Sequence, residues 1–169
     1  MESRQRDVLG VGIDIAVAPR FERLMATNAD RVWAHWFTPA ERRECALAPD
    51  RGRASAARFA MKEAVYKAVG VAFSGELRWR DIEVLRHGTH WRVRLHGEVA
   101  RAARAGGVGE VSVTTSWVGD TVLAMSMALG ATKSADHGCR VEAAGPAVQA
   151  ESTRRQPPLA THTSRGDGP

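Results

Sequence analysis

The sequence predicts an α+β fold in which antiparallel strands are combined with long helices. An apolar, β-branched run of strand length, Val8–Val17, lies near the start of the chain. Residues 53–69 place apolar side chains at helical spacing, whereas the second half of the chain alternates with a period of two. No internal repeat is visible in the sequence. Long helices among antiparallel strands are typical of the α+β class.

The first half of the chain is predicted to be helical after this strand. Pro19 suits the first turn of a helix. Thr38 and Glu41 form a capping-box pattern around a proline, which predicts the start of a second helix. The third and longest helix, over residues 53–69, is expected to end at Gly70.

The second half is predicted to contain two antiparallel strand pairs and one short helix. Glycine-containing turns separate its alternating apolar runs, as they do in hairpins. The expected elements are, in order, strands over 82–85 and 91–95 joined around His87-Gly88, a helix over 98–105 that Gly106-Gly107 stop, and strands over 111–117 and 121–127 joined around Gly119-Asp120.

The composition indicates one domain with a basic charge. Of 169 residues, 44% are hydrophobic, and 24 Lys and Arg face 19 Asp and Glu, which gives a formal net charge of +5 and a pI near 10.0. A chain of this length can bury a core without disulfides or metals. The basic charge permits an acidic partner, such as nucleic acid, a membrane surface or an acidic protein.

We expect the protein to reside in the cytoplasm. Cys45 and Cys139 are too few for a disulfide framework, which favours a reducing compartment. No run of about 18 apolar residues occurs, so no membrane span is predicted. Residues 1–7 are charged and lack the apolar core of a signal peptide.

The chain is expected to divide into a folded domain and a tail. Residues 1–130 carry the apolar periodicity of a folded domain. Residues 131–169 contain Gly, Pro, Ser, Thr and scattered charges without an apolar period. Such a segment cannot offset its ordering entropy by burial, so we predict a disordered tail over 131–169.

Asp14 is unusual because it lies between Ile13 and Ile15, in a segment that is expected to be a buried strand. Asp is depleted in strands, and a buried carboxylate without a partner is costly. Two interpretations are open. The carboxylate caps a nearby loop or pairs with an arginine, or it serves as a metal ligand or base.

Four charged residues on the long helix form a second candidate site. Arg58 and Lys62 are four residues apart and share a helix face, as do Glu63 and Lys67. The alternative to a functional role is an exposed ion pair, because Glu63 and Lys67 have the orientation that stabilises a helix by about 0.2–0.5 kcal/mol.

The scarcity of lysine favours a functional role. Only three of the 24 basic residues are lysines, and Lys62 and Lys67 are two of them. Lys presents a compact charge with three donors, which suits a phosphate. Mg²⁺ is typically held by one or two carboxylates together with phosphate oxygens and water. Glu63, with Asp14 as the second acid, would therefore suit a divalent ion beside a polyphosphate.

Three sequence motifs occur in a fixed order along the chain. They are Gly10-Val11-Gly12-Ile13-Asp14-Ile15, then Arg58-Phe59-Ala60 with Lys62-Glu63-Ala64 and Lys67-Ala68, and then Trp79-Arg80-Asp81-Ile82-Glu83-Val84. In this order and spacing the chain resembles holo-acyl-carrier-protein synthase, the short type of 4′-phosphopantetheinyl transferase, from about Leu9 to Leu129. The resemblance implies an antiparallel sheet packed on a long helix. It also implies transfer of 4′-phosphopantetheine from coenzyme A (CoA) to a serine of an apo acyl or peptidyl carrier protein.

The resemblance implies roles for the charged residues as well. Asp14 and Glu63 would hold Mg²⁺ with the CoA diphosphate and, together with Lys67, form the catalytic group. Arg58, Lys62 and Lys67 would contact the phosphates of CoA. A metal ion and nearby cations stabilise the charge that builds up on the diphosphate oxygens. The sequence does not assign the base that removes the serine proton.

The family is typically a homotrimer with its sites between subunits, and its acidic carrier partner meets a basic and apolar helix surface. The corresponding residues here are Arg20, Arg23, Leu24 and Arg31. A solvated arginine face is the alternative interpretation. A basic face opposite an acidic partner mainly raises the association rate and fixes the orientation.

The chain departs from the family pattern at Thr115, where the family usually has histidine. Thr115 would still hydrogen-bond a CoA phosphate, but it supplies no titratable imidazole. Residues 71–75 are also more apolar than the expected glycine-rich loop. These departures support a second hypothesis, a divergent homologue that binds CoA or a carrier-bound thioester and has a different or no transferase activity.

Binding to nucleic acid is disfavoured. The chain has no dense Lys/Arg stripe and no aromatic stacking motif, and its acidic residues are interleaved with the basic ones. The five tryptophans are spread along the chain and are expected in the core or in interfaces. The histidines expected on the surface are His87, His90 and His96.

Overall fold

A computed structural model describes residues 6–70 and 78–131 of the chain. Its elements are, in order, β1 (Val8–Val17), α1 (Ala18–Trp36), α2 (Pro39–Leu47), α3 (Arg51–Val69), the 3₁₀ helix η1 (Trp79–Asp81), β2 (Ile82–His87), β3 (His90–Leu95), α4 (Gly97–Ala105), β4 (Val108–Val118) and β5 (Thr121–Gly130). The helices and strands predicted from the sequence are confirmed, with ends that differ by a few residues. The segment 71–75 and the predicted tail, apart from Ala131, lie outside the described residues, so the statements about them stay predictions.

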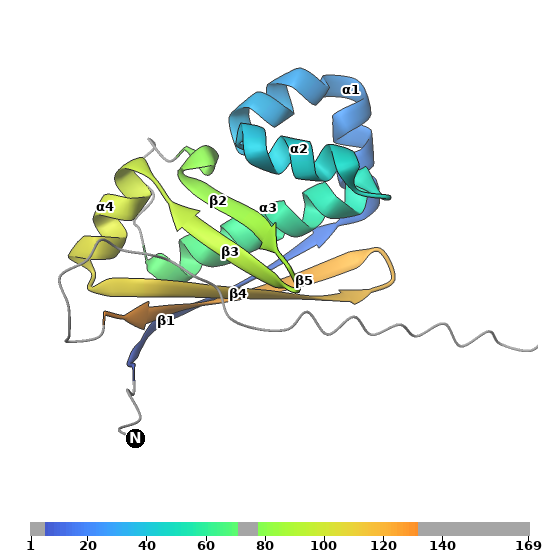
Figure 1. The fold of residues 1–169 in the computed structure, drawn as a ribbon. Coiled ribbons are helices and arrows are strands. Elements are labelled where there is room, and N and C mark those ends of the chain that lie inside the picture. Colours follow the sequence, from blue (N-terminus) through green and yellow to red (C-terminus); the bar gives the residue numbers. More distant parts are fainter. Residues whose placement is uncertain (1–5, 71–77, 132–169) are drawn as a thin grey trace, which may run out of the picture.

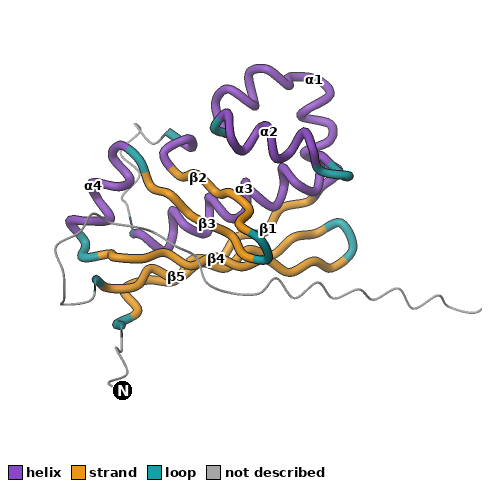
Figure 2. The backbone as a smooth tube through the Cα atoms, viewed as in Figure 1, coloured by secondary structure: helices purple, strands orange, loops and turns teal. Residues whose placement is uncertain are grey.

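Helix α3 is the element around which the others are arranged (Figures 1 and 2). Strands β1, β5 and β4 form an antiparallel sheet in that order, and α3 packs on one face of this sheet. The hairpin of β2 and β3 is a separate two-stranded sheet. Helices α1 and α2 and strand β2 also contact α3, so this helix is enclosed on several sides.

The contact between α3 and β1 is unusually close because both partners are small. Gly10 and Gly12 of β1 lie against the backbone of Ala68 and Ala64 on the helix. A Cβ atom added to Gly12 would overlap the carbonyl oxygen of Ala64 and would lie 2.7 Å from the amide nitrogen of Ala68. Glycine at this position therefore permits the backbone of the strand to touch the helix.

The helix ends follow the sequence signals. Thr38 and Glu41 cap α2 reciprocally: the Thr38 amide donates to Glu41 Oε2 at 2.8 Å, and the Glu41 amide donates to Thr38 Oγ1 at 3.3 Å. The Arg53 amide donates to Asp50 Oδ1 at 2.8 Å at the start of α3. Gly70 ends α3 with a φ of +69°, a left-handed conformation that favours glycine.

Strand β1 corrects one expectation from the sequence, which was a buried strand. It lies at the edge of the sheet, and Ile13 and Ile15 are 52% and 62% exposed. Because side chains alternate along a strand, the small residues and Asp14 face α3 while the large apolar residues face outward. Met125 and Leu123 of β5 lie opposite Ile13 and Ile15 and are also exposed. We call this surface the outer apolar face; its members are Val11, Ile13, Ile15, Val17, Leu123 and Met125.

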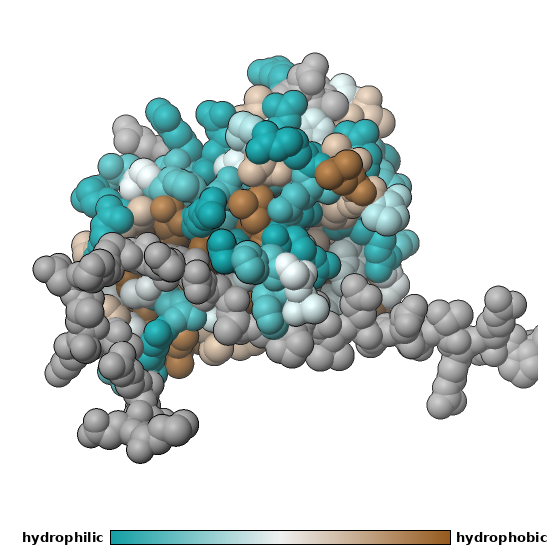
Figure 3. All heavy atoms as spheres, in the orientation of Figure 1, coloured by the Kyte–Doolittle hydropathy of each residue, from teal (hydrophilic) through white to brown (hydrophobic). Residues whose placement is uncertain are grey.

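One side of the molecule differs in character from the outer apolar face. The side of the molecule seen in Figure 3 is mainly hydrophilic, with small apolar patches between polar side chains. His87, His90 and His96 are exposed, as predicted, and Trp33 and Trp91 are buried. Within residues 6–70 and 78–131, no helix combines the length and the apolar character needed to cross a membrane.

The close approach of β1 and α3 predicts that Gly12→Ala lowers the free energy of unfolding by about 1–3 kcal/mol, because the new Cβ atom must displace helix backbone. Gly106→Ala is the matched control. Gly106 has a φ of −79°, and its nearest neighbour would lie 3.5 Å from the new Cβ, so a change within about 0.5 kcal/mol is expected. Urea denaturation measures both values, and equal effects of the two substitutions would contradict the packing argument.

Candidate active site

Asp14, Glu63 and Lys67 come together where β1 meets α3. Lys67 Nζ lies 2.8 Å from Asp14 Oδ1 and donates a second hydrogen bond to the Ile13 carbonyl oxygen at 3.0 Å. Asp14 therefore has a cationic partner, although this partner is a lysine and not the arginine considered from the sequence. Glu63 lies one helical turn before Lys67 on the same flank of α3. These three residues form what we call the acidic cluster.

The two carboxylates of the acidic cluster influence each other. Partial burial and, secondarily, the negative charge of Asp14 raise the pKa of Glu63, while Lys67 opposes that shift. Lys67 interacts with Asp14, so the simple surface pair of Glu63 and Lys67 is not the arrangement observed. Two neighbouring carboxylates beside an exposed lysine are suited to attract a cation and an anion at the same place.

The donor set of the acidic cluster fits a hard divalent cation that shares its ligands with a phosphate. Within the part of the chain that the structure describes, no group of three or more His, Cys, Asp or Glu side chains could hold a metal. Asp14 and Glu63 would therefore supply two oxygen ligands, and the other positions would go to phosphate oxygens and water. Mg²⁺ is bound in this way by many proteins.

Lys62 is not part of the acidic cluster. Its side chain is fully buried, and Nζ lies 2.8 Å from Glu41 Oε2 and donates to the carbonyl oxygens of Trp36 and Trp79 at 2.8 and 3.0 Å. Burial lowers the pKa of Lys62 and raises that of Glu41, while their mutual attraction opposes both shifts. The expected contact of Lys62 with a CoA phosphate does not agree with this geometry, because the ammonium is enclosed by protein.

Helical geometry explains why Lys62 and Glu63 lie in different surroundings. Successive residues of an α-helix are turned by about 100°, so neighbours in sequence face different directions. Glu63 lies on the flank toward the edge strand β1, whereas Lys62 faces α2 and η1. Arg58 shares the flank of Lys62, because the two are four residues apart.

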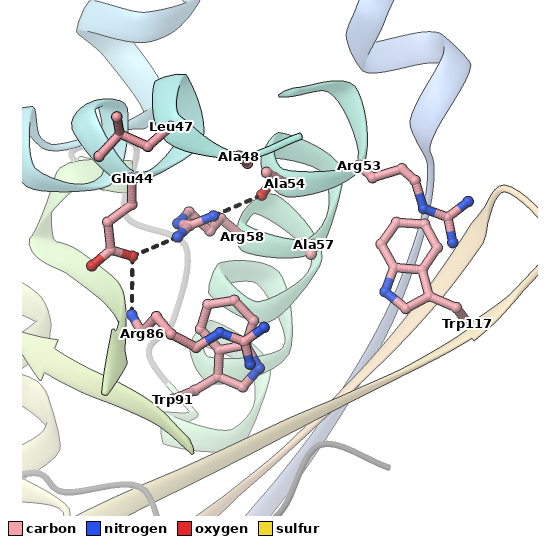
Figure 4. A pocket seen from close by; sticks show the side chains of 10 residues that line it. All are labelled: Glu44, Leu47, Ala48, Arg53, Ala54, Ala57, Arg58, Arg86, Trp91 and Trp117. Carbon is pink, nitrogen blue, oxygen red and sulfur yellow. Dashed lines mark hydrogen bonds and ion pairs between the residues drawn. The ribbon is translucent and has the colours of Figure 1, made fainter. Parts of the chain in front are cut away.

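Arg58 lines a separate pocket of about 460 Å³ (Figure 4). Its guanidinium is nearly buried, contacts Glu44 Oε2 at 2.5 Å and donates to the Ala54 carbonyl oxygen at 3.1 Å. Arg58 Nε and Trp91 Nε1 are buried donors without a hydrogen-bond acceptor in the described residues. Buried donors of this kind are usually satisfied, so the pocket has unused capacity for an acceptor. The lining residues are Glu44, Leu47, Ala48, Arg53, Ala54, Ala57, Arg58, Arg86, Trp91 and Trp117.

Arginines stacked on tryptophans form two walls of this pocket. The guanidinium of Arg86 lies 4.3 Å from the centre of the Trp91 ring, and that of Arg53 lies 4.0 Å from the centre of the Trp117 ring. Three arginines line the pocket and Glu44 is the one acid among its lining residues, although Arg53 also pairs with Asp120 at 3.2 Å. The pocket therefore combines positive charge with flat aromatic surfaces, and we call it the arginine–tryptophan pocket.

Thr115 lies on the same face of the sheet as Asp14 but two strands away. The register pairs Asp14 with Ala124 and Ala124 with Thr115, and adjacent strands are about 4.8 Å apart. Ala124 is fully buried in the core beneath α3. Trp117 of the arginine–tryptophan pocket follows Thr115 by two residues and shares its face of β4. Within one chain, Asp14, Glu63 and Lys67 thus lie close together, whereas Arg58 and Thr115 lie on the other side of α3.

The predicted carrier-binding residues lie on α1. Arg20, Arg23 and Arg31 are exposed, and Leu24 is half-buried. The spacing of Arg20, Arg23 and Leu24 places them on neighbouring positions of one helix surface. The surface is therefore accessible, and its partner stays a prediction.

Comparison with known proteins identifies the family. A model described as the 4′-phosphopantetheinyl transferase superfamily matches residues 10–119, which include Asp14, Glu63 and Lys67. The chain belongs to this superfamily. Holo-[acyl-carrier-protein] synthase from Desulforudis audaxviator is 37% identical over 128 residues, which cover 75% of this chain and 97% of that protein.

Solved structures of the superfamily have the same fold. Holo-[acyl-carrier-protein] synthase from Neisseria meningitidis superposes with a TM-score of 0.65 at 29% identity, covering 72% of this chain and 98% of that chain. The ACPS–CoA complex of Chronobacterium ammoniagenes gives a TM-score of 0.60 at 27% identity, covering 72% and 96%. This superfamily member therefore has the α+β architecture that the sequence predicts.

Three residues that lie at or near the candidate sites were not recognised from the sequence. Glu41 was recognised as a helix cap, but not as the partner of Lys62. Arg86 and Trp91 lie directly opposite each other in the β2–β3 hairpin. A hairpin that turns around Gly88 places residues 86 and 91 opposite each other. The strand register of the predicted hairpin could therefore have revealed the pair of Arg86 and Trp91.

The two lysines are predicted to differ in their contribution to stability. Lys62→Met leaves Glu41 buried without its cation and should lower the free energy of unfolding by about 3–5 kcal/mol. Lys67→Met removes a partly exposed pair and should cost about 1 kcal/mol or less. Urea denaturation of both variants tests this, and similar losses would show that Lys62 is not held as described.

Proposed function

We propose that this chain transfers 4′-phosphopantetheine from CoA to a serine of an apo acyl carrier protein or carrier domain, with Mg²⁺. The observation that carries the proposal is the convergence of Asp14, Glu63 and Lys67 at one point of the fold. The names of the relatives support it, since holo-[acyl-carrier-protein] synthases and an ACPS–CoA complex are similar to this chain over most of their length. The pathway of the carrier is left open.

Each member of the acidic cluster has a role in this reaction. Asp14 and Glu63 would hold the ion together with diphosphate oxygens of CoA, and the ion would stabilise the negative charge on those oxygens. The ammonium of Lys67, which pairs with Asp14 in the structure, would contact a phosphate oxygen of CoA. The serine oxygen forms a bond to the phosphorus that carries pantetheine. The bond from this phosphorus to the departing adenosine 3′,5′-bisphosphate breaks, and the serine proton passes to a base.

The arginine–tryptophan pocket suits the nucleotide end of CoA. CoA carries phosphates next to a flat purine, and the pocket offers buried donors of Arg58 and Trp91 beside aromatic surfaces. Thr115, close to Trp117 along β4, supplies a hydroxyl that hydrogen-bonds a phosphate. In this proposal Lys62 makes no contact with CoA, because its ammonium is enclosed.

We propose a homotrimer, and two features of the single chain support association between copies. The outer apolar face leaves Ile13, Ile15 and their neighbours exposed, and a surface of this kind marks an interaction site. Helix α3 also separates the acidic cluster from Arg58 and Thr115 within one chain. Association of copies in a ring would bring the acidic cluster of one copy to the arginine–tryptophan pocket of the next. The exposed arginines of α1 stay available to an acidic carrier in the cytoplasm.

Thr115 favours a second candidate function. If an imidazole at this position is needed for transfer, the chain is a divergent homologue that binds CoA or a carrier-bound thioester and performs a different reaction or none. The retained acidic cluster favours the first function, since a binding protein needs no paired carboxylates at the phosphate site.

The proposed function predicts that incubation with CoA, Mg²⁺ and apo carrier proteins adds the phosphopantetheine mass to the carrier, read by intact mass spectrometry. Asp14→Ala and Glu63→Gln should each reduce the rate by about 100-fold or more, because a metal contributes several kcal/mol and each 1.36 kcal/mol is tenfold. Glu98→Gln, an exposed acid on α4, is the control and should retain the rate. Binding of CoA without mass gain on any carrier would support the divergent homologue.

Assembly of the site from two copies predicts complementation between inactive variants. Asp14→Ala and Arg58→Met should each be inactive alone, whereas refolding them as a mixture should restore about a quarter of the wild-type activity, because random mixing rebuilds that share of the sites. Introducing Ile15→Asp into both variants should give monomers by light scattering and abolish the restoration. Absence of restoration in a mixture of folded trimers would contradict a shared site.

A further inference from the structure

The ammonium of Lys62 is a point where four segments of the chain meet. Lys62 belongs to α3 and binds Glu41 of α2, the carbonyl oxygen of Trp36 at the end of α1, and the carbonyl oxygen of Trp79 in η1. All three acceptors lie within 3.0 Å of Nζ, and the side chain is fully buried. An ammonium has three protons, so these contacts use its entire donor capacity.

The two carbonyl acceptors belong to tryptophans whose rings both pack against Phe59 of α3. The ring centre of Phe59 lies 4.8 Å from that of Trp36 and 5.5 Å from that of Trp79. Phe59 precedes Glu63 by four residues and therefore shares its helix face. We call these three rings the aromatic wall. Lys62 thus holds the backbone of both outer members of the wall, and the central member, Phe59, lies one helical turn before Glu63.

The choice of lysine in an arginine-rich chain fits this geometry. Lys is a compact point charge with three donors, whereas Arg presents a planar fork of five donors on a larger head. Three acceptors from separate segments converge on one small centre at Lys62. The scarcity of lysine, which the sequence suggested as a sign of phosphate binding, has a different origin at this position.

We infer that Lys62 is a positioning residue, which sets the aromatic wall beside Glu63 from within the core and acts through Glu41 and the two tryptophan carbonyls. This inference rests on the proposed function. Loss of the Lys62 contacts releases the end of α1 and η1 from α3. The aromatic wall then shifts relative to Glu63. Displacements of about 1 Å near a reacting centre can cost about 100-fold in rate.

A substitution at Glu41 distinguishes between two roles of Lys62, that of a positioning residue and that of a phosphate ligand. If Lys62 contacted a CoA phosphate, removal of the negative charge of Glu41 would leave that contact intact or strengthen it. If Lys62 acts by positioning, Glu41→Gln weakens the anchor and reproduces the effect of changing Lys62 itself. Arg at position 62 gives a second distinction, since a phosphate contact tolerates Arg, whereas three converging acceptors do not.

The experiment compares Glu41→Gln, Lys62→Arg and Lys62→Met with Lys67→Met and with Arg42→Gln, an exposed neighbour of Glu41. The full-length proteins are examined by near-ultraviolet circular dichroism in the tryptophan bands and by transfer kinetics with CoA. We expect the Glu41 and Lys62 variants to change the tryptophan bands and to lose kcat by about 10- to 100-fold, with KM for CoA within about twofold of wild type. Lys67→Met should raise KM for CoA without a change in the bands, and Arg42→Gln should behave as wild type.

Unchanged tryptophan bands and kcat in Glu41→Gln would overturn the inference. Restoration of wild-type kinetics by Lys62→Arg, or a rise in KM alone in the Lys62 variants, would also overturn it. If Lys62→Met does not fold, Glu41→Gln, which keeps the buried volume, and Lys62→Arg, which keeps the charge, decide the question. If wild-type protein modifies no carrier, the proposed function fails, while the dichroism still reports whether Lys62 sets the aromatic wall.

Discussion

The direct contact between the backbone of β1 and helix α3 is the constraint on which the rest of the structure depends. Gly10 and Gly12 leave no side chain between strand and helix, so the strand lies directly against the backbone of Ala64 and Ala68. At this separation the next inward-facing residue of the strand, Asp14, reaches Lys67. A larger residue at either glycine would move the strand away from the helix. The geometry of the acidic cluster is therefore a consequence of packing between the smallest residues in the chain.

Helix α3 distributes its charged residues by angle, and the surroundings then decide what each can do. Glu63 and Lys67 lie at an open edge and keep access to solvent. Arg58 opens onto a pocket, where its partner Glu44 uses only part of its donor capacity. Lys62 is enclosed by three segments and is satisfied within the core. The turn of about 100° per residue separates Lys62 from Glu63. Arg58 and Lys62 share a flank, and their roles differ because different segments pack over them.

Much of this arrangement could be predicted from the sequence, and the exceptions have physical reasons. The capping box at Thr38, the left-handed Gly70 and the glycine-containing turns are local signals, and each is confirmed. The proximity of Asp14 and Glu63, which lie far apart in the sequence, was inferred from residue type and resemblance, and the structure agrees. The burial of Lys62 was not predictable, because it depends on how α1, α2 and η1 close over one flank of α3. Helical periodicity fixes the direction in which a side chain leaves the helix, whereas tertiary packing decides whether that side chain reaches solvent.

The alternation of β1 links the acidic cluster to association of the chain. The same two-residue period that turns Asp14 toward α3 turns Ile13 and Ile15 outward, so the acid and the outer apolar face are opposite sides of one strand. A shift of one residue in register would exchange these sides, placing isoleucines against the close-packed helix and the carboxylate on the apolar surface. Burying the outer apolar face against another copy would stabilise the register that orients Asp14. If copies assemble through this face, their assembly and the alignment of the acidic cluster would be physically coupled through a single strand.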